Sequence, residues 1–319
     1  MNDRYRQARP DTPGNPSLTY ANGVQLRELK KALPLRVLSE ADFEHWQRRG
    51  YVIIRQAVPE EQVRRTVDFL WEFQELDRHD PASWNQAERR SHGMAELNGS
   101  GMVEVYQNQH LWDNRQTQRV YDAFVDIWDR EDLWVSLDRA NLNTPNRGAR
   151  AFTGFIHWDS DTSMTPLPIN VQGVLALSDT SEETGGFQCI PELFEHFDDW
   201  RAAAPQDRHP FRPDLDHVPW SVKFVPMKAG DLLIFNSLLA HGIRPNTSED
   251  QVRLAQYISF APAHSSDAAL REERVRAWRE CQAPEGFAFP GDPREWEKTR
   301  YGRAELTELG EKILGARDC

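Results

Sequence analysis

The chain has little cysteine and no long apolar run. Its 319 residues include 3 cysteines, Cys189, Cys281 and Cys319, which form no CxxC pair and no even disulfide framework. This cysteine usage favours a reducing compartment, and the cytoplasm is the expected location. No stretch approaches the roughly 18 consecutive apolar residues that a membrane-spanning helix needs. We therefore expect no membrane association.

Positive charge is also in short supply. Lys and Arg total 38 against 50 Asp and Glu, which gives a formal net charge of −12. This balance argues against nucleic-acid binding driven by the overall electrostatic field of the protein, because phosphate contacts need clustered Lys and Arg. The composition is 39% hydrophobic and 10% aromatic, which suffices for a packed core and excludes a wholly disordered chain. The sequence leaves the oligomeric state open.

Composition divides the chain into a tail and one large domain. Residues 1–36 are rich in Pro, Asn and Arg, and we expect them to form a poorly ordered N-terminal segment. Residues 37–319 are expected to form a single domain, with a β core over about residues 133–262 and a C-terminal extension over residues 263–319. Apolar periodicity and capping signals predict helices over residues 39–50, 59–76 and 119–129.

Short strand-like runs separated by turn signals follow from about residue 133. They are LWVSLDR, INVQGVLALS, FQCI, SVKFVPM, DLLIF and VRLAQYISFA. In the last run Leu254 and Ile258 fall on one face, whereas Arg253, Ala255 and Tyr257 fall on the other, as in a strand. Many short strands at this spacing indicate a mainly β fold with flanking helices, built as a double-sheet barrel or jelly roll.

The segment FIHWDSD carries the first chemical signal. His157 and Asp159 are two residues apart, so on an extended strand end they point to the same side and can share one cation. A lone pair of this kind is weak evidence, because most such pairs are surface residues or make a local hydrogen bond. A metal site is indicated only if a second segment supplies a further ligand.

That second segment is AGDLLIFNSLLAHGIRPNTSEDQVR, which contains His241 and, 12 residues later, Arg253. Two imidazoles and one carboxylate form the facial ligand set that is typical of non-haem Fe(II) oxygenases, in which open positions remain for co-substrates. A buried Arg on the polar face of the next strand needs a carboxylate, which its fork can bind through two hydrogen bonds. The distal carboxylate of 2-oxoglutarate meets that need, and an internal acidic side chain is the alternative.

Taken together, these pieces resemble the phytanoyl-CoA dioxygenase-like family of Fe(II)/2-oxoglutarate-dependent oxygenases. The matching segments are LSEADFEHWQRRGYVIIRQAVPEEQV, HWD, LALSDTSEETGGFQCIPELF and AGDLLIFNSLLAHGIRPNTSEDQVR, within residues 37–262. The resemblance implies a double-stranded β-helix core, a jelly-roll or cupin-like fold, with helices backing one sheet. It also implies Fe(II) as the cofactor, with 2-oxoglutarate and O₂ as co-substrates. By the same resemblance His157, Asp159 and His241 are the catalytic iron ligands and Arg253 clamps 2-oxoglutarate.

The chain departs from some relatives around the co-substrate. A small hydroxylic residue two positions after the distal histidine assists the co-substrate in those relatives, but Ile243 stands there. The position two after Arg253 is Ala255. Help with the distal carboxylate therefore has to come from elsewhere, and Asn143 and Tyr257 are the candidates for co-substrate binding.

The reaction itself is less closely defined than the metal chemistry. Halogenating members of the wider superfamily have a small residue where this chain keeps Asp159, so hydroxylation of a small metabolite is the expected outcome. Desaturation, epoxidation and cyclisation use the same iron chemistry and stay open. Two other classes also stay open, namely a non-redox cupin-like metalloenzyme and a catalytically silent binding protein.

Overall fold

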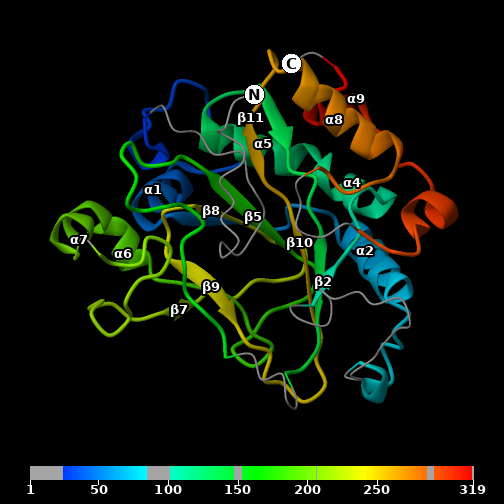
Figure 1. The fold of residues 1–319 in the computed structure, drawn as a ribbon, viewed down its shortest axis with the longest axis horizontal. Helices are drawn as coiled ribbons and strands as arrows, with labels where there is room; N and C mark the ends of the chain where they lie inside the picture. The colour runs from blue at the N-terminus through cyan, green and yellow to red at the C-terminus, as the bar shows by residue number, and fades with distance from the viewer. Residues whose placement is uncertain (1–23, 85–100, 147–152, 206, 286–290, 318–319) are drawn as a thin grey trace.

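A computed structural model describes the chain over most of its length. It covers residues 24–84, 101–146, 153–205, 207–285 and 291–317. The described part combines antiparallel sheets with helices that lie mainly around their edges and on one face (Figure 1). Within it, no helix is both long enough and apolar enough to cross a bilayer.

The largest element is a six-stranded antiparallel sheet, called the main sheet below. Its spatial order is β1-β8-β5-β10-β4-β2, so neighbours in space come from distant parts of the sequence. The strands are β1 (Tyr51–Ile54), β8 (Leu232–Asn236), β5 (Val171–Ala176), β10 (Arg253–Tyr257), β4 (Ala140–Asn143) and β2 (Met102–Val103).

Two smaller sheets complete the β structure. The three-stranded sheet, called the small sheet below, has the order β7-β6-β9 and consists of β7 (Lys223–Phe224), β6 (Gly186–Cys189) and β9 (His241–Arg244). The third sheet pairs β11 (Phe260–Pro262) with β3 (Leu133–Val135). The run predicted as one strand over residues 252–261 is therefore divided between β10 and β11.

One apolar cluster joins the main sheet to the small sheet. Leu233 and Phe235 of β8 and Ala176 of β5 pack with Phe187 and Cys189 of β6. Because side chains alternate along a strand, the residues between them point to the opposite face of the main sheet. The face of the main sheet that carries Leu233, Phe235 and Ala176 is therefore the one that faces the small sheet, and polar side chains on this face lie between the two sheets.

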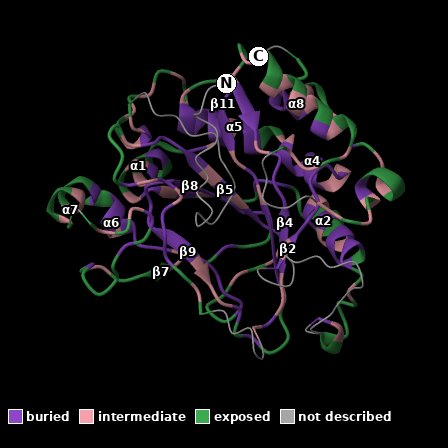
Figure 2. Cartoon of the chain, viewed as in Figure 1, coloured by how far each residue is buried: buried purple, intermediate pink, exposed green. Residues whose placement is uncertain are grey.

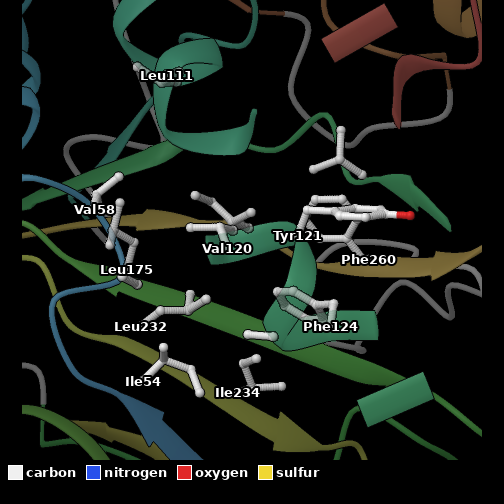
Figure 3. Packing of buried hydrophobic residues seen from close by; sticks show 14 of the residues in the cluster. Ile54, Val58, Leu111, Val120, Tyr121, Phe124, Leu175, Leu232, Ile234 and Phe260 are labelled. Atoms are coloured by element: carbon white, nitrogen blue, oxygen red, sulfur yellow. The ribbon is translucent and has the colours of Figure 1, made fainter. Parts of the chain in front are cut away.

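Helices cover the other face of the main sheet. Leu175 of β5 and Leu232 and Ile234 of β8 pack there against Val120 and Phe124 of α5 (Figure 3). The strands are largely buried, and exposed residues gather on helices and loops (Figure 2). The α-helices are α1 (Glu40–Arg49), α2 (Glu60–Phe73), α4 (Gln109–Arg115), α5 (Gln118–Trp128), α6 (Pro191–Glu195), α7 (Phe197–Ala203), α8 (Ala268–Arg279) and α9 (Glu308–Leu314). The short turns η2 (Leu26–Glu28) and η3 (Pro81–Ser83) are 3₁₀-helical, and η5 (Glu297–Tyr301) is π-helical.

Helix α1 shows why the predicted helices form where they do. Ser39 and Asp42 make a reciprocal capping box that supplies partners for free backbone N–H groups at the helix start. Gly50 ends the helix in the left-handed region with φ of 79°, where a side chain is disfavoured. Both signals are local in the sequence, so the predicted boundaries at residues 39 and 50 are confirmed.

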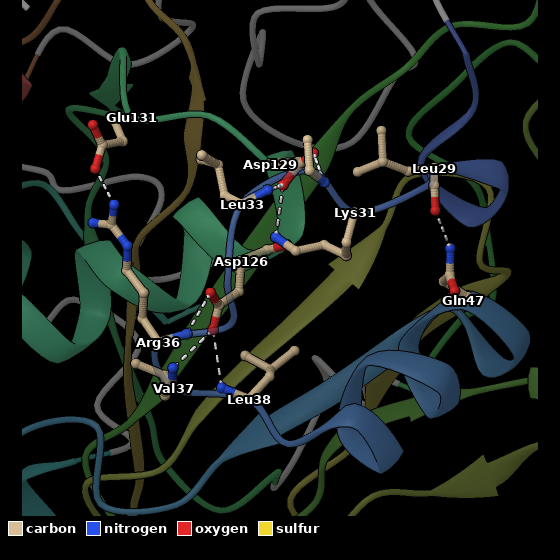
Figure 4. A network of polar contacts seen from close by, with 11 residues as sticks. Leu29, Lys31, Leu33, Arg36, Val37, Leu38, Gln47, Asp126, Asp129 and Glu131 are labelled. Carbon is tan, nitrogen blue, oxygen red and sulfur yellow. Dashed lines mark hydrogen bonds and ion pairs between the residues drawn. The ribbon is translucent and has the colours of Figure 1, made fainter.

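A polar network fixes residues 31–38 to the end of α5 (Figure 4). The carboxylate of Asp126, which is fully buried, accepts hydrogen bonds from the backbone N–H groups of Arg36, Val37 and Leu38. Asp129 accepts in the same way from residues 32 and 33. Within residues 24–36, the described part of the segment expected to be poorly ordered, Asp126 and Asp129 thus accept hydrogen bonds from the backbone of residues 32, 33 and 36, and the predicted disorder stays a prediction. Residues 1–23 lie outside the described residues.

Candidate metal centre

The small sheet brings the two histidines of the predicted site side by side. His157 and His241 form an antiparallel bridge in which each backbone N–H donates to the other residue's carbonyl, at 2.7 Å and 2.9 Å. His241 is also the first residue of β9, opposite Cys189 of β6. Asp159 follows His157 by two residues, so both side chains project from the same side of this extended segment.

Gly242 allows this close approach. A Cβ atom at residue 242 would lie 1.8 Å from the carbonyl oxygen of Phe155, so the backbone would have to shift to admit one. Only a residue without a side chain lets the segment of His157 lie this close to β9. The HG pair after the buried strand DLLIF is therefore a steric requirement of the site as well as a source of one imidazole.

The three polar side chains converge within a few ångströms. His157 Nε2 lies 3.1 Å from Asp159 Oδ1, and His241 Nε2 lies 3.1 Å from Asp159 Oδ2. One nitrogen or oxygen atom from each residue lies within 4.8 Å of the others, which is a spacing that can hold a metal ion. The predicted convergence of these residues is thus present in the structure, and their role as ligands stays a prediction.

Hydrogen bonding sets which nitrogen of His241 faces the site. Its Nδ1 lies 2.9 Å from the backbone carbonyl oxygen of Leu239, and a carbonyl can only accept, so Nδ1 carries the proton. The other ring nitrogen, Nε2, faces the site and lies 3.1 Å from Asp159 Oδ2. A backbone carbonyl in this position orients metal-binding imidazoles in many proteins.

The site is deeply buried and keeps a negative charge. Burial opposes ionisation of Asp159, but the charges of His157 and His241 and hydrogen bonds to both rings outweigh it, so the pKa of this carboxyl is held below its usual range. Aromatic rings surround the imidazoles. Phe235 packs against the His241 ring at 4.4 Å between centroids, and Phe187 stacks on its plane at 5.6 Å.

Gln172 is a site residue that the sequence reasoning missed. It lies in β5, and its Nε2 donates a hydrogen bond to Asp159 Oδ2. The available signal was the amide of Gln172 within the largely apolar run INVQGVLALS, where it alternates with Val171 and Gly173. That signal identifies an inward-facing polar side chain but not the carboxylate that it contacts.

Arg253 lies in the same interior, on β10. The side chain is buried, and its Nε has no hydrogen-bond partner among the described residues. Burial is the main cause that lowers the pKa of this guanidinium below its ordinary value, which reports an environment poor in counter-charge. Its stem reaches toward the small sheet, because a Cβ built at Gly186 of β6 would lie 3.7 Å from Arg253 Cδ.

The other two predicted co-substrate residues lie on the same face of the main sheet as Arg253. Asn143 of β4 is the ladder partner of Arg253, and its backbone oxygen accepts a hydrogen bond from Asn246. Tyr257 lies four residues along β10, on the face of Arg253, and its charge interaction with Arg253 favours the protonated guanidinium. The structure thus places both near Arg253 along the sheet, and their roles stay predictions.

Two arginines that follow His241 in the sequence can be compared directly. Arg244, at the end of β9, pairs with Glu182 at 2.8 Å and lies over the ring of Phe224. Arg253 has no ion pair within the part of the chain that the structure describes. Of these two arginines, Arg253 is therefore the one without a carboxylate partner among the described residues.

These features define the class of protein. A buried His-Asp-His set between antiparallel sheets is the ligand pattern of non-haem metal oxygenases. The sequence profile of the phytanoyl-CoA dioxygenase family (PhyH) matches residues 46–255, and the chain belongs to this family. Oxygenases of this family use Fe(II) together with 2-oxoglutarate.

Individual relatives are distant in sequence. Ava biosynthesis cluster protein O of Aspergillus versicolor is 25% identical over 253 residues, which are 72% of this chain and 80% of the relative. Among solved structures, hypothetical protein JW0805 of Escherichia coli superimposes with a TM-score of 0.60 at 15% identity, covering 87% of this chain and 81% of that chain. GIG2 of Candida albicans gives a TM-score of 0.59 at 13% identity, covering 86% and 76%. At these identities the two structures support the fold alone.

Proposed function

We propose that this protein is an Fe(II)/2-oxoglutarate-dependent dioxygenase that hydroxylates an unactivated C–H bond of a small metabolite, with release of succinate and CO₂. One observation carries the proposal. A buried His-Asp-His set and a buried Arg253 without a carboxylate partner among the described residues share one interior. The first fits a divalent iron, and the second fits the far end of a dicarboxylic co-substrate.

The proposed iron ligands are His157 Nε2, the Asp159 carboxylate and His241 Nε2. Two neutral imidazoles and one carboxylate suit Fe(II), and three protein ligands leave further positions for other groups. Each side chain has a defined task in this assignment. Asp159 supplies the anion, and the carbonyl of Leu239 fixes the protonation of His241 so that Nε2 is free.

Arg253 is the proposed clamp for the distal carboxylate of 2-oxoglutarate. An isolated guanidinium in a low-dielectric interior is unfavourable, and a bound carboxylate relieves that cost through a bidentate pair. Asn143 and Tyr257 lie near Arg253 along the sheet and are proposed to support the same carboxylate. Arg244 is already paired with Glu182, so it is a poor alternative.

Bound iron, 2-oxoglutarate and O₂ supply the oxidising chemistry, and the protein supplies binding, orientation and exclusion of competing groups. The rings of Phe187 and Phe235 limit water around His241. Asp159 occupies the position at which a halogenating enzyme would leave room for halide, which supports hydroxylation. Desaturation, epoxidation or cyclisation would follow from a different placement of the substrate over the same centre.

The fold that supports this function is proposed to be a double-stranded β-helix within a single domain over residues 37–319. The packing of the main sheet on the small sheet through one apolar cluster supports the first part. The second part is supported by one continuous core that contains both Leu38 near the start and Leu314 near the end. Arg274 of α8 also donates to the carbonyl oxygens of Val135 and Leu314, which ties the C-terminal extension to β3.

The test is a screen for substrate-stimulated succinate formation over a panel of small metabolites. The purified protein is supplied with Fe(II), 2-oxoglutarate and O₂, and succinate and oxidised product are measured together by mass spectrometry. The proposal expects at least one compound to raise succinate formation, with product gaining one oxygen atom. Turnover that needs neither O₂ nor 2-oxoglutarate would instead establish a non-redox metalloenzyme and contradict the proposal.

A further inference from the structure

Gln172 contacts the central carboxylate from the main sheet. Its Nε2 donates to Asp159 Oδ2, the same oxygen that lies 3.1 Å from His241 Nε2. Asp159 Oδ1, in contrast, lies 3.1 Å from His157 Nε2. The two oxygens of one carboxylate therefore have different surroundings.

The fold places the amide there with little freedom. Gln172 pairs with Phe235 across the ladder between β5 and β8, and the ring of Phe235 packs on His241. The next residue, Gly173, faces the other way and lies so close to the neighbouring backbone that a Cβ would meet the Ile258 carbonyl oxygen at 2.2 Å. The backbone of β5 at Gln172 is thus held between its two neighbouring strands, and the amide is aimed at Asp159.

The chemistry of the contact is asymmetric. An ionised carboxylate can only accept hydrogen bonds, so Gln172 must present its NH₂ group to Asp159. A hydrogen bond from this group engages Oδ2 and leaves Oδ1 as the better electron-pair donor to a cation. Carboxylates bind metals through one oxygen or through both, and the second oxygen occupies an additional coordination position.

We propose that Gln172 is a positioning residue that holds Asp159 as a one-oxygen ligand and so keeps a coordination position free for the co-substrates. This inference rests on the proposed function, because it takes Asp159 to be an iron ligand. Partners that orient metal ligands in this way change metal affinity or activity by about 10- to 100-fold when they are removed. The effect on this chain is expected within that range.

The test uses Co(II) as a spectroscopic substitute for Fe(II) and needs no substrate. Gln172→Met keeps the length of the side chain and removes the donor. Gln188→Met is the matched control, since the Gln188 amide contacts the Phe155 carbonyl oxygen at 3.4 Å and none of the three site residues. Co(II) affinity, the visible Co(II) spectrum and the 2-oxoglutarate affinity of the Co(II)-loaded protein are measured for each.

Gln172→Met is expected to weaken Co(II) binding about 10- to 100-fold, to change the position and intensity of the Co(II) bands, and to weaken 2-oxoglutarate binding. Gln188→Met is expected to stay within a factor of about two. Melting of the metal-free proteins checks folding, and Gln172→Leu serves as a second variant if Gln172→Met is destabilised. Wild-type affinity and spectrum in a folded Gln172 variant would overturn the inference alone. A wild-type protein that binds no Co(II) or Fe(II) would overturn the proposed function and this inference together.

Discussion

Replacing Arg253 by methionine should separate ligand binding from stability. The guanidinium is buried, and its Nε has no hydrogen-bond partner among the described residues, so the metal-free protein holds a desolvated cation with little compensation. Methionine fills similar space without the charge. We therefore expect the melting temperature of the metal-free Arg253→Met protein to equal or exceed that of the wild type, whereas 2-oxoglutarate binding collapses.

The size of the loss follows from the burial of the pair that would form. Truncating one partner of a buried, hydrogen-bonded ion pair typically costs about 2–5 kcal/mol. This corresponds to a loss of 2-oxoglutarate affinity of roughly 30-fold to several thousand-fold. Arg253→Lys keeps the positive charge but loses the bidentate fork, so its loss should be smaller.

Calorimetric titration of the Co(II)-loaded proteins with 2-oxoglutarate measures this effect directly, and Co(II) affinity measured beforehand should be nearly unchanged. Arg244→Met is the matched control, because Arg244 is already paired with Glu182. Its 2-oxoglutarate affinity should stay within a factor of about two. The reasoning is refuted if Arg253→Met binds 2-oxoglutarate within a factor of about two of wild type, or if its metal-free form is clearly destabilised, since the latter indicates a structural role.

Three further predictions concern other parts of the molecule. Asp159→Ala removes the only anionic ligand and should abolish substrate-stimulated succinate formation, measured by mass spectrometry; near-normal turnover would show that the ligand assignment is wrong. Gly242→Ala places a Cβ 1.8 Å from the Phe155 carbonyl oxygen. It should lower the free energy of unfolding in urea by about 1–3 kcal/mol and weaken Co(II) binding. An unchanged urea midpoint would exclude the close approach. Burial raises the pKa of Glu297 to about 7, against the opposing charge of Arg115 and two backbone hydrogen bonds. Because the folded state then binds a proton more tightly than the unfolded chain, this contribution is complete below about pH 4.5 and is lost as the pH rises toward 7. The melting temperature of Glu297→Gln relative to wild type should therefore rise between those pH values, and a constant difference would contradict the shift.

The parts of the fold that sequence predicts well are those with local causes. Ser39, Asp42 and Gly50 mark the ends of α1 within one short segment, so the helix is readable without knowledge of its neighbours. The alternation around Arg253 and Tyr257 likewise follows from the geometry of a single strand. The convergence of His157 with His241 could not be predicted from one segment alone. It was predicted from the order of the motifs along the chain, which resembles that of a known family.

The features that the sequence did not reveal depend on contacts between distant segments. Asp126 looks like an ordinary polar residue of a helix, yet it binds the backbone N–H groups of residues 36–38. Gln172 is one amide in an apolar run, and only the pairing of β5 with β8 places it against Asp159. Gly242 has no helix-capping or turn signal that would separate it from other glycines. In each case the information lies in which segments pack together, and composition and periodicity do not contain it.

The central claim is that His157, Asp159 and His241 hold an iron that also binds 2-oxoglutarate. The most direct measurement is an anaerobic titration of the metal-free protein with Fe(II) and then with 2-oxoglutarate, followed by visible absorption. The account predicts a weak charge-transfer band that appears only when both are present, saturates stoichiometrically and is absent from Asp159→Ala. A wild-type protein that shows no band at saturating Fe(II) and 2-oxoglutarate, or an Asp159→Ala protein that retains it, would contradict the account.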